Sequence, residues 1–264
     1  MMRVGVLGCA GRLHASLRDC GLEPVTLARS DPERRLLDAA AVETVDGMAA
    51  FFDALDYPRT YILDVELGAE IDRLIDSVYV HMEPGDVVVD PSGSYWCDTL
   101  RRYRRMRHRS IYLVDTARIE RAGKARLLAS GDDRGIAIVR DILVRWAGEA
   151  AFHHVGGAGL SHYMLMVEEA LANVEAQARN EAALMVEAWP AQADEGLAKV
   201  MFPLIERRWM GRAAWQLDDA LRLEAATPLM AQAAMLNLAE ALDEHTPSPP
   251  APRIAGFQHP DEIL

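Results

Sequence analysis

The amino-acid sequence predicts a doubly wound α/β domain followed by an all-helical domain, with one long helix between them. In the first half, short apolar runs rich in β-branched residues alternate with helical patterns, and Gly or Pro separates them. The second half has no such runs and is rich in Ala, Leu, Met and Glu. We therefore expect an α/β domain over residues 1–155 and a helical dimerisation and substrate domain over residues 156–264.

Six apolar runs of the first half are predicted to be strands. Because strands that alternate with helices are joined by crossover connections, we expect one parallel sheet. The predicted strands are Arg3–Leu7, Pro24–Leu27, Thr60–Val65, Asp86–Asp90, Ile111–Val114 and Arg126–Ala129.

The second half is expected to be helical with an extended tail. From Gly159 to Trp189 there is no internal Gly or Pro, which predicts one long helix that ends before Pro190. Proline residues are frequent from Thr246 to Pro252, so the end of the chain is expected to reach away from the subunit. Further helices are predicted over Glu195–Met210, Gln216–Leu223 and Pro228–Asp243.

Composition limits the class of protein. The net charge of −12 disfavours binding to nucleic acid or to an anionic membrane, because both require a positive field. Neither a signal peptide nor an apolar stretch of about 20 residues is evident, so we expect a cytoplasmic protein without a membrane span. Cys9, Cys20 and Cys97 lack CxxC spacing, which argues against disulfides and a zinc site, and no metal is expected.

A glycine turn follows the first predicted strand and precedes a helix. This context is typical of a Rossmann-type dinucleotide site, where backbone approaches a pyrophosphate at a helix N-terminus. The cofactor is expected to contact Gly8, Ala10, Gly11, Arg12 and Leu13. In the GxGxxG pattern, alanine takes the second glycine position and leucine the third. The alternative interpretation is a glycine turn that holds no ligand.

The residues after the second predicted strand favour NADP(H) over NAD(H). An acidic residue there binds a ribose 2′-hydroxyl, whereas an arginine accommodates a 2′-phosphate. Arg29 occupies this place, and the hydroxyl of Ser30 adds a second donor. The alternative is that Arg29 is a solvated loop charge and Ser30 or Asp31 caps the next helix.

Four features of the chain form a recognisable set: Glu83–Tyr95 (EPGDVVVDPSGSY), Gly156–His162 (GGAGLSH), Gly211–Ala220 and the spacing of Arg253 and His259. With this set the chain resembles the 6-phosphogluconate dehydrogenase family. In the family, an arginine and a histidine at the C-terminus come from the neighbouring subunit to bind the substrate phosphate. The resemblance thus implies a homodimer with exchanged tails and assigns substrate binding to Arg253 and His259.

The resemblance does not extend to the family's proton-transfer residues. When His162 is set on the family's motif histidine, the general-base lysine becomes Leu165 and the general-acid glutamate becomes Ala172. Glu168 and Glu169 take the places of a substrate-binding histidine and asparagine. The family's cofactor-binding and substrate-binding asparagine after the fourth strand becomes Gly93, which is still expected to border the cofactor. Oxidative decarboxylation of 6-phosphogluconate is therefore excluded.

The long helix still carries polar groups that could serve another reaction. At 100° per residue, His162, Glu169 and Asn173 share one face. Glu169 is the favoured acid or base, with His162 and Tyr163 as alternatives. The competing interpretations are a solvated carboxylate at Glu169 and a structural hydrogen bond at His162. Substrate contacts are expected from Ser94, Glu168, Asn173, Arg253 and His259.

These observations favour an NADP(H)-dependent oxidoreductase acting on a small anionic carbonyl, hydroxyl or imine substrate. The alternatives are a noncatalytic protein that binds a nucleotide or sugar phosphate, and an isomerase or lyase on the same fold. Two further features are not assigned to the site. The arginine run 101–109 is interpreted as a solvated helix face, and Asp64 either faces the cofactor crevice or simply ends its strand.

Overall fold

The computed structural model describes residues 2–8, 12–28, 30–39, 42, 44–65, 69–121, 123–187, 232–233 and 235. The chain divides into two compact units, Met1–Leu165 and Met166–Leu264. The helices predicted over 195–210 and 216–223 and the tail over 246–252 lie outside the described residues. Of the helix predicted over 228–243, only Gln232, Ala233 and Met235 are described, and they are helical. The predicted boundary at 155/156 stays a prediction.

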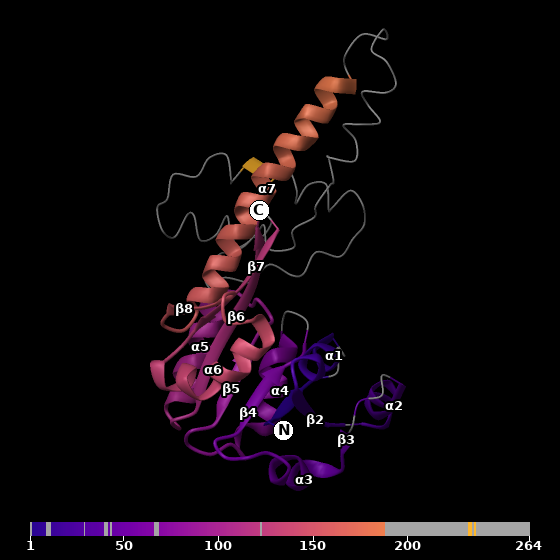
Figure 1. Cartoon of the computed structure of the whole chain (residues 1–264), viewed down its shortest axis with the longest axis vertical. Helices are drawn as coiled ribbons and strands as arrows, with labels where there is room; N and C mark the ends of the chain where they lie inside the picture. Colours follow the sequence, from indigo (N-terminus) through magenta and orange to yellow (C-terminus); the bar gives the residue numbers. More distant parts are fainter. Residues whose placement is uncertain are drawn as a thin grey trace, which may run out of the picture. The chain divides into compact units, whose positions relative to one another are not determined.

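The first unit is built on a sheet whose described strands run in the order β3-β2-β1-β4-β5-β6-β7-β8 (Figure 1). From β3 to β6 all neighbouring strands are parallel, so the predicted Rossmann-type fold is confirmed. The strands are β1 (Met2–Leu7), β2 (Leu22–Leu27), β3 (Thr44–Val45), β4 (Thr60–Leu63), β5 (Val87–Asp90), β6 (Tyr112–Arg121), β7 (Lys124–Ser130) and β8 (Phe152–Gly156).

Three features of the sheet differ from the prediction. Strand β3 has two residues, too few to show a period, and β8 carries exposed His153 and His154 rather than an apolar run. Strand β7 pairs antiparallel with β6, so the predicted all-parallel sheet is wrong at this edge. Both strands extend past the predicted ends as an exposed, charged hairpin around Gly123, where no hydrophobic pattern marks a strand.

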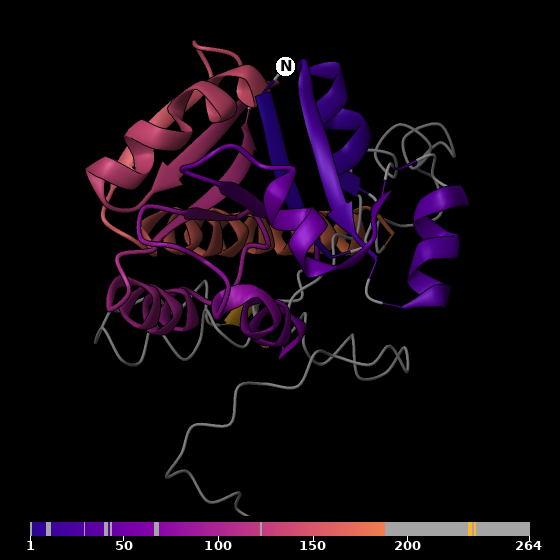
Figure 2. The same cartoon turned by 90° about the horizontal axis from the view of Figure 1, so that it is seen from below.

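Helices cover both faces of the sheet, as a doubly wound fold requires (Figure 2). One face packs against α3, α4 and α5, and the other against α1 and α6. The long helix predicted over 159–189 is confirmed, because α7 spans Leu160–Glu187. The other bounds are α1 (Arg12–Asp19), α2 (Asp31–Ala39), α3 (Gly47–Asp53), α4 (Ala69–Tyr79), α5 (Trp96–Arg107) and α6 (Asp133–Ala147).

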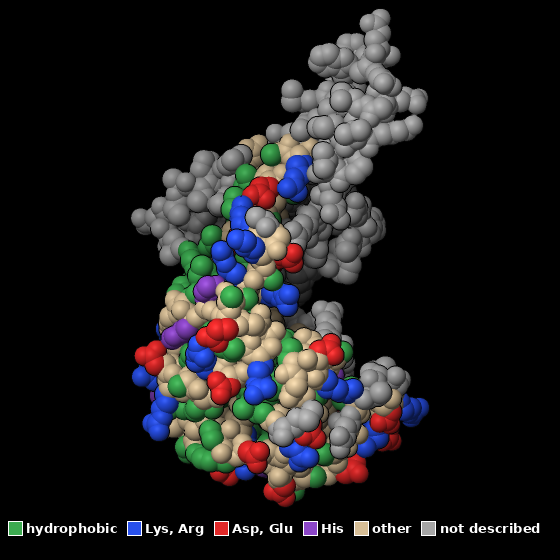
Figure 3. Space-filling model, in the orientation of Figure 1, with side chains coloured by type: hydrophobic (Ala, Val, Ile, Leu, Met, Phe, Trp, Pro, Cys, Tyr) green, Lys and Arg blue, Asp and Glu red, His purple; other side chains and the backbone are tan. Residues whose placement is uncertain are grey.

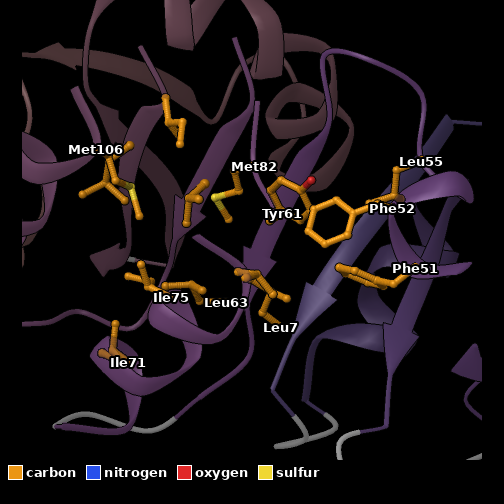
Figure 4. Close-up of a cluster of buried hydrophobic side chains, with 14 of the residues drawn as sticks. Leu7, Phe51, Phe52, Leu55, Tyr61, Leu63, Ile71, Ile75, Met82 and Met106 are labelled. Atoms are coloured by element: carbon orange, nitrogen blue, oxygen red, sulfur yellow. The ribbon is translucent and has the colours of Figure 1, made fainter. Parts of the chain in front are cut away.

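An aromatic group closes one end of the core on the α3 side of the sheet (Figure 4). The rings of Phe51, Phe52 and Tyr61 lie with centroids 5.6 to 6.1 Å apart. Tyr61 is fully buried, and its hydroxyl donates to Asp86 at 3.2 Å. Burial and the neighbouring Asp86 carboxylate raise the pKa of Tyr61, so this hydroxyl remains protonated.

The turn before β5, which carried part of the family resemblance, is structural. The buried Asp86 carboxylate accepts the backbone N–H of Arg59 at 2.9 Å and that of Glu83 at 3.0 Å. Gly85 has φ +103°, and a Cβ there would lie 2.7 Å from the Tyr57 hydroxyl. The turn thus joins the start of β5 to the start of β4, at the amino end of the sheet.

The surface of the first unit carries both signs of charge. On the face shown in Figure 3, the side chains of Lys and Arg are interspersed with those of Asp and Glu. No helix within the described residues combines the length and apolar character needed to cross a membrane.

Candidate functional site

The candidate site lies at the carboxyl edge of the parallel strands. Strands β1 and β4 are neighbours, but the chain leaves β1 towards β2 on the other side, so the strand order reverses between them. Ligands of open α/β sheets bind in the crevice at such a switch point. The carboxyl ends of β1, β4, β5 and β6 therefore border the site.

Gly8 ends β1 with its backbone pressed against the end of β4. Its φ is +114°, and a Cβ at this position would lie 2.3 Å from the Asp64 carbonyl oxygen and 2.8 Å from Val65. The Asp64 N–H also donates to the Leu7 carbonyl at 2.8 Å. No side chain fits here, so this position of the turn requires glycine; its contact with a cofactor stays a prediction.

Of the other predicted cofactor residues, Ala10, Gly11 and Arg29 lie outside the described residues. Arg12 begins α1, the helix whose N-terminus faces the site, and Leu13 packs partly buried against the core. Ser30 is exposed before α2, and its Oγ accepts the Glu33 N–H at 3.4 Å. Ser30 is thus a helix cap, and its hydroxyl proton remains available to a ligand.

Three buried carboxylates follow three adjacent strands at this edge: Asp64 after β4, Asp90 at the end of β5 and Asp115 in β6. Each is at most 3% exposed. A buried carboxylate requires a partner, since desolvation of an isolated charge costs several kcal/mol. Asp90 and Asp115 have different partners, and each of these two carboxylates holds a different part of the site.

Asp90 and Arg102 hold the loop that follows β5. The Asp90 Oδ1 accepts the Ser92 N–H at 3.0 Å, and the Arg102 guanidinium donates to Ser94 Oγ at 3.0 Å. Ser92 and Ser94 share a hydrogen bond of 2.7 Å. Gly93, between them, has φ +65°. The loop carrying the predicted cofactor contact Gly93 and substrate contact Ser94 is therefore held by side-chain hydrogen bonds.

Arg102 is in turn fixed by Asp72 of α4. Its Nε and Nη2 donate to the two Asp72 oxygens at 3.1 Å each. Burial raises the pKa of Asp72, but hydrogen bonds from Arg102 and Arg101 outweigh it and lower the pKa to about 2. Arg102 is only 4% exposed. The solvated-face interpretation of the arginine run is therefore wrong at Arg102, although Arg101 is exposed.

Asp115 anchors the N-terminus of α7. Its carboxylate accepts the Gly159 N–H at 2.7 Å, the His162 N–H at 3.2 Å and the Ser130 hydroxyl at 2.6 Å. The Ser161 N–H donates to the same Ser130 Oγ at 2.8 Å. A negative charge at a helix N-terminus is favourable, so α7 begins at a fixed place beside β6.

His162 is buried within this anchor. Its Nε2 lies 3.1 Å from the Asp90 carbonyl oxygen, and its Nδ1 lies 2.8 Å from the Thr99 hydroxyl. A carbonyl only accepts, so Nε2 donates to it and Nδ1 accepts from Thr99. With 2% exposure and both nitrogens engaged, His162 ties α7 to β5 and α5. This geometry favours a structural role for His162 over a role in proton transfer.

The remaining predicted residues occupy different environments. The Tyr163 ring is partly exposed and meets Trp96 edge-on, with centroids 5.7 Å apart. Glu168, Glu169 and Asn173 lie on α7 in the second unit, where Asn173 is buried and both glutamates are partly buried. Arg253 and His259 lie outside the described residues. The assigned roles of all these residues stay predictions.

Sequence reasoning missed three residues that organise the site: Arg102, Thr99 and Asp115. One signal was available, since an aspartate ends or interrupts each of three apolar strands. A carboxylate in such a buried position indicates a partner nearby, but the pattern along one strand does not say which element supplies it.

Comparison with known proteins identifies the family to which the chain belongs. The model of the NAD-binding domain of 6-phosphogluconate dehydrogenase matches residues 4–156, which is more than half of the chain. The chain belongs to the 6-phosphogluconate dehydrogenase family. Its match to family sequences covers the α/β unit and, in the curated relatives, only part of the full-length protein.

Among curated relatives, the 6-phosphogluconate dehydrogenase of Klebsiella pneumoniae is 28% identical over 158 residues. The match covers 56% of this chain and 34% of the relative, so the chain spans about a third of the relative's length in this match.

Two solved structures share the fold. The 3-hydroxyisobutyrate dehydrogenase of Salmonella typhimurium has a TM-score of 0.69 at 18% identity, covering 94% of this chain and 96% of the other. The 6-phosphogluconate dehydrogenase of Plasmodium falciparum has a TM-score of 0.69 at 14% identity, covering 98% of this chain and 68% of the other.

Proposed function

We propose that this chain is an NADP(H)-dependent oxidoreductase that reduces a carbonyl or imine group, or oxidises the corresponding hydroxyl or amine, in a small anionic substrate. The observation that carries the proposal is the turn at Gly8. Its φ is positive and its backbone lies so close to Asp64 that no side chain fits, as expected of the first glycine of a dinucleotide-binding turn. The turn lies at the switch point of the sheet, where dinucleotides bind in this fold.

The preference for NADP(H) rests on Arg29 and Ser30. Because Ser30 Oγ accepts the Glu33 N–H, its own proton is free to donate to a 2′-phosphate. An arginine next to it supplies the charge-assisted, bidentate contact that phosphate favours. The structurally similar dehydrogenase of Plasmodium falciparum is described in complex with NADP+.

The reaction proposed differs from that of 6-phosphogluconate dehydrogenase. Leu165 stands where the resemblance places the base lysine, and a leucine cannot take a proton from a hydroxyl. Hydride transfer to a polarised double bond needs no such base, only a proton donor and correct placement. Glu169 is the proposed donor, and Tyr163 and His162 are the alternatives.

The bound cofactor would supply the hydride, and the residues described above would position it. Gly8 admits the pyrophosphate, and the loop held by Arg102 places Gly93 at the carboxyl end of β5. Asp115 fixes the start of α7, the helix that carries the proposed proton donor.

The substrate and assembly proposed follow from the C-terminal residues. Arg253 and His259 are proposed to reach the neighbouring subunit of a homodimer and to bind a phosphate or carboxylate of the substrate. Among the described residues, Cys20 and Cys97 form no disulfide, which suits the reducing cytoplasm where we place the protein.

Fluorescence titration of the protein with NADPH and NADH tests the cofactor assignment. Wild type is expected to bind NADPH at least tenfold more tightly, and Arg29→Ala is expected to remove most of this preference. The matched control is Arg35→Ala, which removes an exposed arginine of α2. Equal affinities for the two cofactors in wild type would refute the NADP(H) assignment.

Turnover is tested with small aldehydes, ketones and imines that carry a carboxylate or phosphate. NADPH consumption with at least one class is expected. Stoichiometric NADPH binding without turnover on any class would refute the oxidoreductase proposal and favour a noncatalytic binding protein. Solvent hydrogen exchange into substrate without NADPH consumption would favour an isomerase or lyase.

A further inference from the structure

A buried histidine and carboxylate lie directly beside the glycine turn, and the proposed function does not use them. His14, in the first turn of α1, and Asp64, after β4, are each 3% exposed. His14 Nδ1 lies 3.6 Å from Asp64 Oδ2. On its other side, His14 Nε2 lies 2.8 Å from the hydroxyl of Thr26 in β2. One imidazole thus connects three elements that surround the end of β1.

His14 and Asp64 are close but are not joined by a hydrogen bond. At 3.6 Å, Nδ1 and the carboxylate oxygen are too far apart for a hydrogen bond, and Nδ1 has no hydrogen-bond partner among the described residues. Burial lowers the pKa of His14 more than the Asp64 carboxylate raises it, and Arg18 lowers it further. His14 is therefore neutral near pH 7 while the protein is free of ligand.

Among the described residues, Asp64 and Arg18 are the charged groups that shift the pKa of His14. Asp64 faces it from β4, Arg18 lies one turn further along α1, and β2 contributes the uncharged hydroxyl of Thr26. The charge that His14 senses in the described structure is thus set mainly by one buried carboxylate and one exposed arginine.

Binding of a dinucleotide would change this balance. The pyrophosphate of a dinucleotide binds at the N-terminus of the helix after the first strand, here α1, of which His14 is the third residue. A second negative charge near the buried Asp64 carboxylate is unfavourable in a medium of low dielectric constant. A proton on His14 compensates it and closes the gap to Asp64 with a charge-assisted hydrogen bond.

We propose that His14 and Asp64 are positioning residues for the dinucleotide, and that the pair takes up a proton from solvent when the pyrophosphate binds. The proton lies on His14 Nδ1 and is shared with Asp64, which draws α1 and β4 together around the turn at Gly8. No bond to the cofactor forms. The inference rests on the proposed function, because it requires that a dinucleotide bind here.

Linkage gives the sign and size of the effect. If binding takes up one proton, affinity rises as pH falls, by up to about tenfold for each pH unit between the pKa values of His14 in the free and bound protein. The lower limit of this window lies below 6.5, because the pKa of His14 in the free protein is lowered from that value. Measurements between about pH 6 and about pH 8 cover the transition.

The experiment is isothermal titration calorimetry with NADPH in two buffers of different ionisation enthalpy. Wild type is expected to take up a substantial fraction of one proton at about pH 7.5. His14→Gln keeps a group that can hydrogen-bond Thr26 but cannot titrate, so uptake should fall towards that of the ligand alone. His153→Gln, an exposed histidine of β8, is the control and should behave as wild type. Since the 2′-phosphate of NADPH also titrates, the difference between wild type and variant is the quantity compared.

Asp64→Asn separates positioning by charge from mere structural support. It removes the negative charge, so NADPH affinity at about pH 8 should equal or exceed that of wild type, and the pH dependence should weaken. A structural residue would instead give weaker binding at every pH with an unchanged slope. Thermal unfolding of each variant confirms that it is folded.

The outcomes are distinct from those of the proposed function. NADPH binding by wild type without proton uptake would overturn this inference alone, as would uptake that survives in His14→Gln. If wild type binds neither NADPH nor NADH, the proposed function fails, and this inference fails with it.

Discussion

Two properties of Gly8 would resist replacement by alanine: its positive φ and the close contact of its backbone with β4. Comparing Gly8→Ala with Gly148→Ala should separate the two effects. Gly8 and Gly148 both have positive φ, +114° and +85°. At Gly8 a Cβ would lie 2.3 Å from the Asp64 carbonyl oxygen, whereas at Gly148, after α6, no atom lies within 4 Å. The two alanine variants share the backbone strain, and only Gly8→Ala adds a collision between β1 and β4.

The magnitudes follow from these contacts. A sparsely populated backbone conformation with positive φ costs an alanine about 1–3 kcal/mol, and both variants carry a cost of this kind. Relief of a contact of 2.3 Å requires strand backbone to shift, which as overpacking costs a further 1–3 kcal/mol or so. The melting temperature of Gly8→Ala is then expected to lie about 2–12 °C below that of Gly148→Ala.

Thermal unfolding followed by circular dichroism measures the loss of stability, and fluorescence titration with NADPH measures the loss of cofactor affinity. Gly148→Ala should bind NADPH as wild type does, whereas Gly8→Ala should bind at least about a hundredfold more weakly, because its methyl group collides with the end of β4 and forces the turn that is proposed to hold the pyrophosphate to shift. Equal melting temperatures for the two variants, or undiminished NADPH binding by Gly8→Ala, would refute the reasoning.

Three further variants test other parts of the site. The pKa of Asp72 is lowered from 3.8 to about 2. Its ion pair therefore stabilises the fold above pH 3.8, and this contribution is lost as the pH falls towards 2. In urea unfolding over this pH range, the free energy of unfolding of wild type should fall by about 1–2 kcal/mol more than that of Asp72→Asn. Asp115→Asn should lower the free energy of unfolding in urea by about 2–4 kcal/mol, because three donors lose a charged acceptor. The control Asp133→Asn, at an exposed site, should change it by no more than about 0.5 kcal/mol. Equal losses in the two variants would contradict the proposal that Asp115 anchors α7. Glu169→Gln should lower kcat by about a hundredfold or more with little change in NADPH affinity, and an unchanged kcat would remove Glu169 as proton donor.

Much of the fold was predictable because local patterns report it. Strand β5 is a run of valines that ends in aspartate, and α7 is long and free of internal Gly and Pro, so both were located within a few residues. The two-residue β3 and the exposed β8 were missed because neither has the apolar run that marks a buried strand. The direction of β7 was wrong, since a strand's residues are the same whichever way its neighbour runs.

Of the candidate site, the sequence predicted only the part that depends on backbone conformation. Glycine at position 8 reports a conformation, and the conformation was found. Arg102 lies in a run of arginines that looks solvated, and only the packing of α5 on α4 turns it towards Asp72. His14 and Asp64 are 50 positions apart, and no local pattern connects them. Long-range partners of buried charges are a property of topology, which periodicity does not encode.

The anchor of α7 has a consequence for how such proteins diverge. Asp115, Ser130 and His162 hold the start of the helix, and none of them coincides with Leu165 or Ala172, where the resemblance places the family's proton-transfer residues. Mutation at those two positions therefore leaves the attachment of the helix intact. A lineage can lose one reaction and acquire another while its architecture is preserved, and a protein engineer can diversify the outward positions of α7 on the same support.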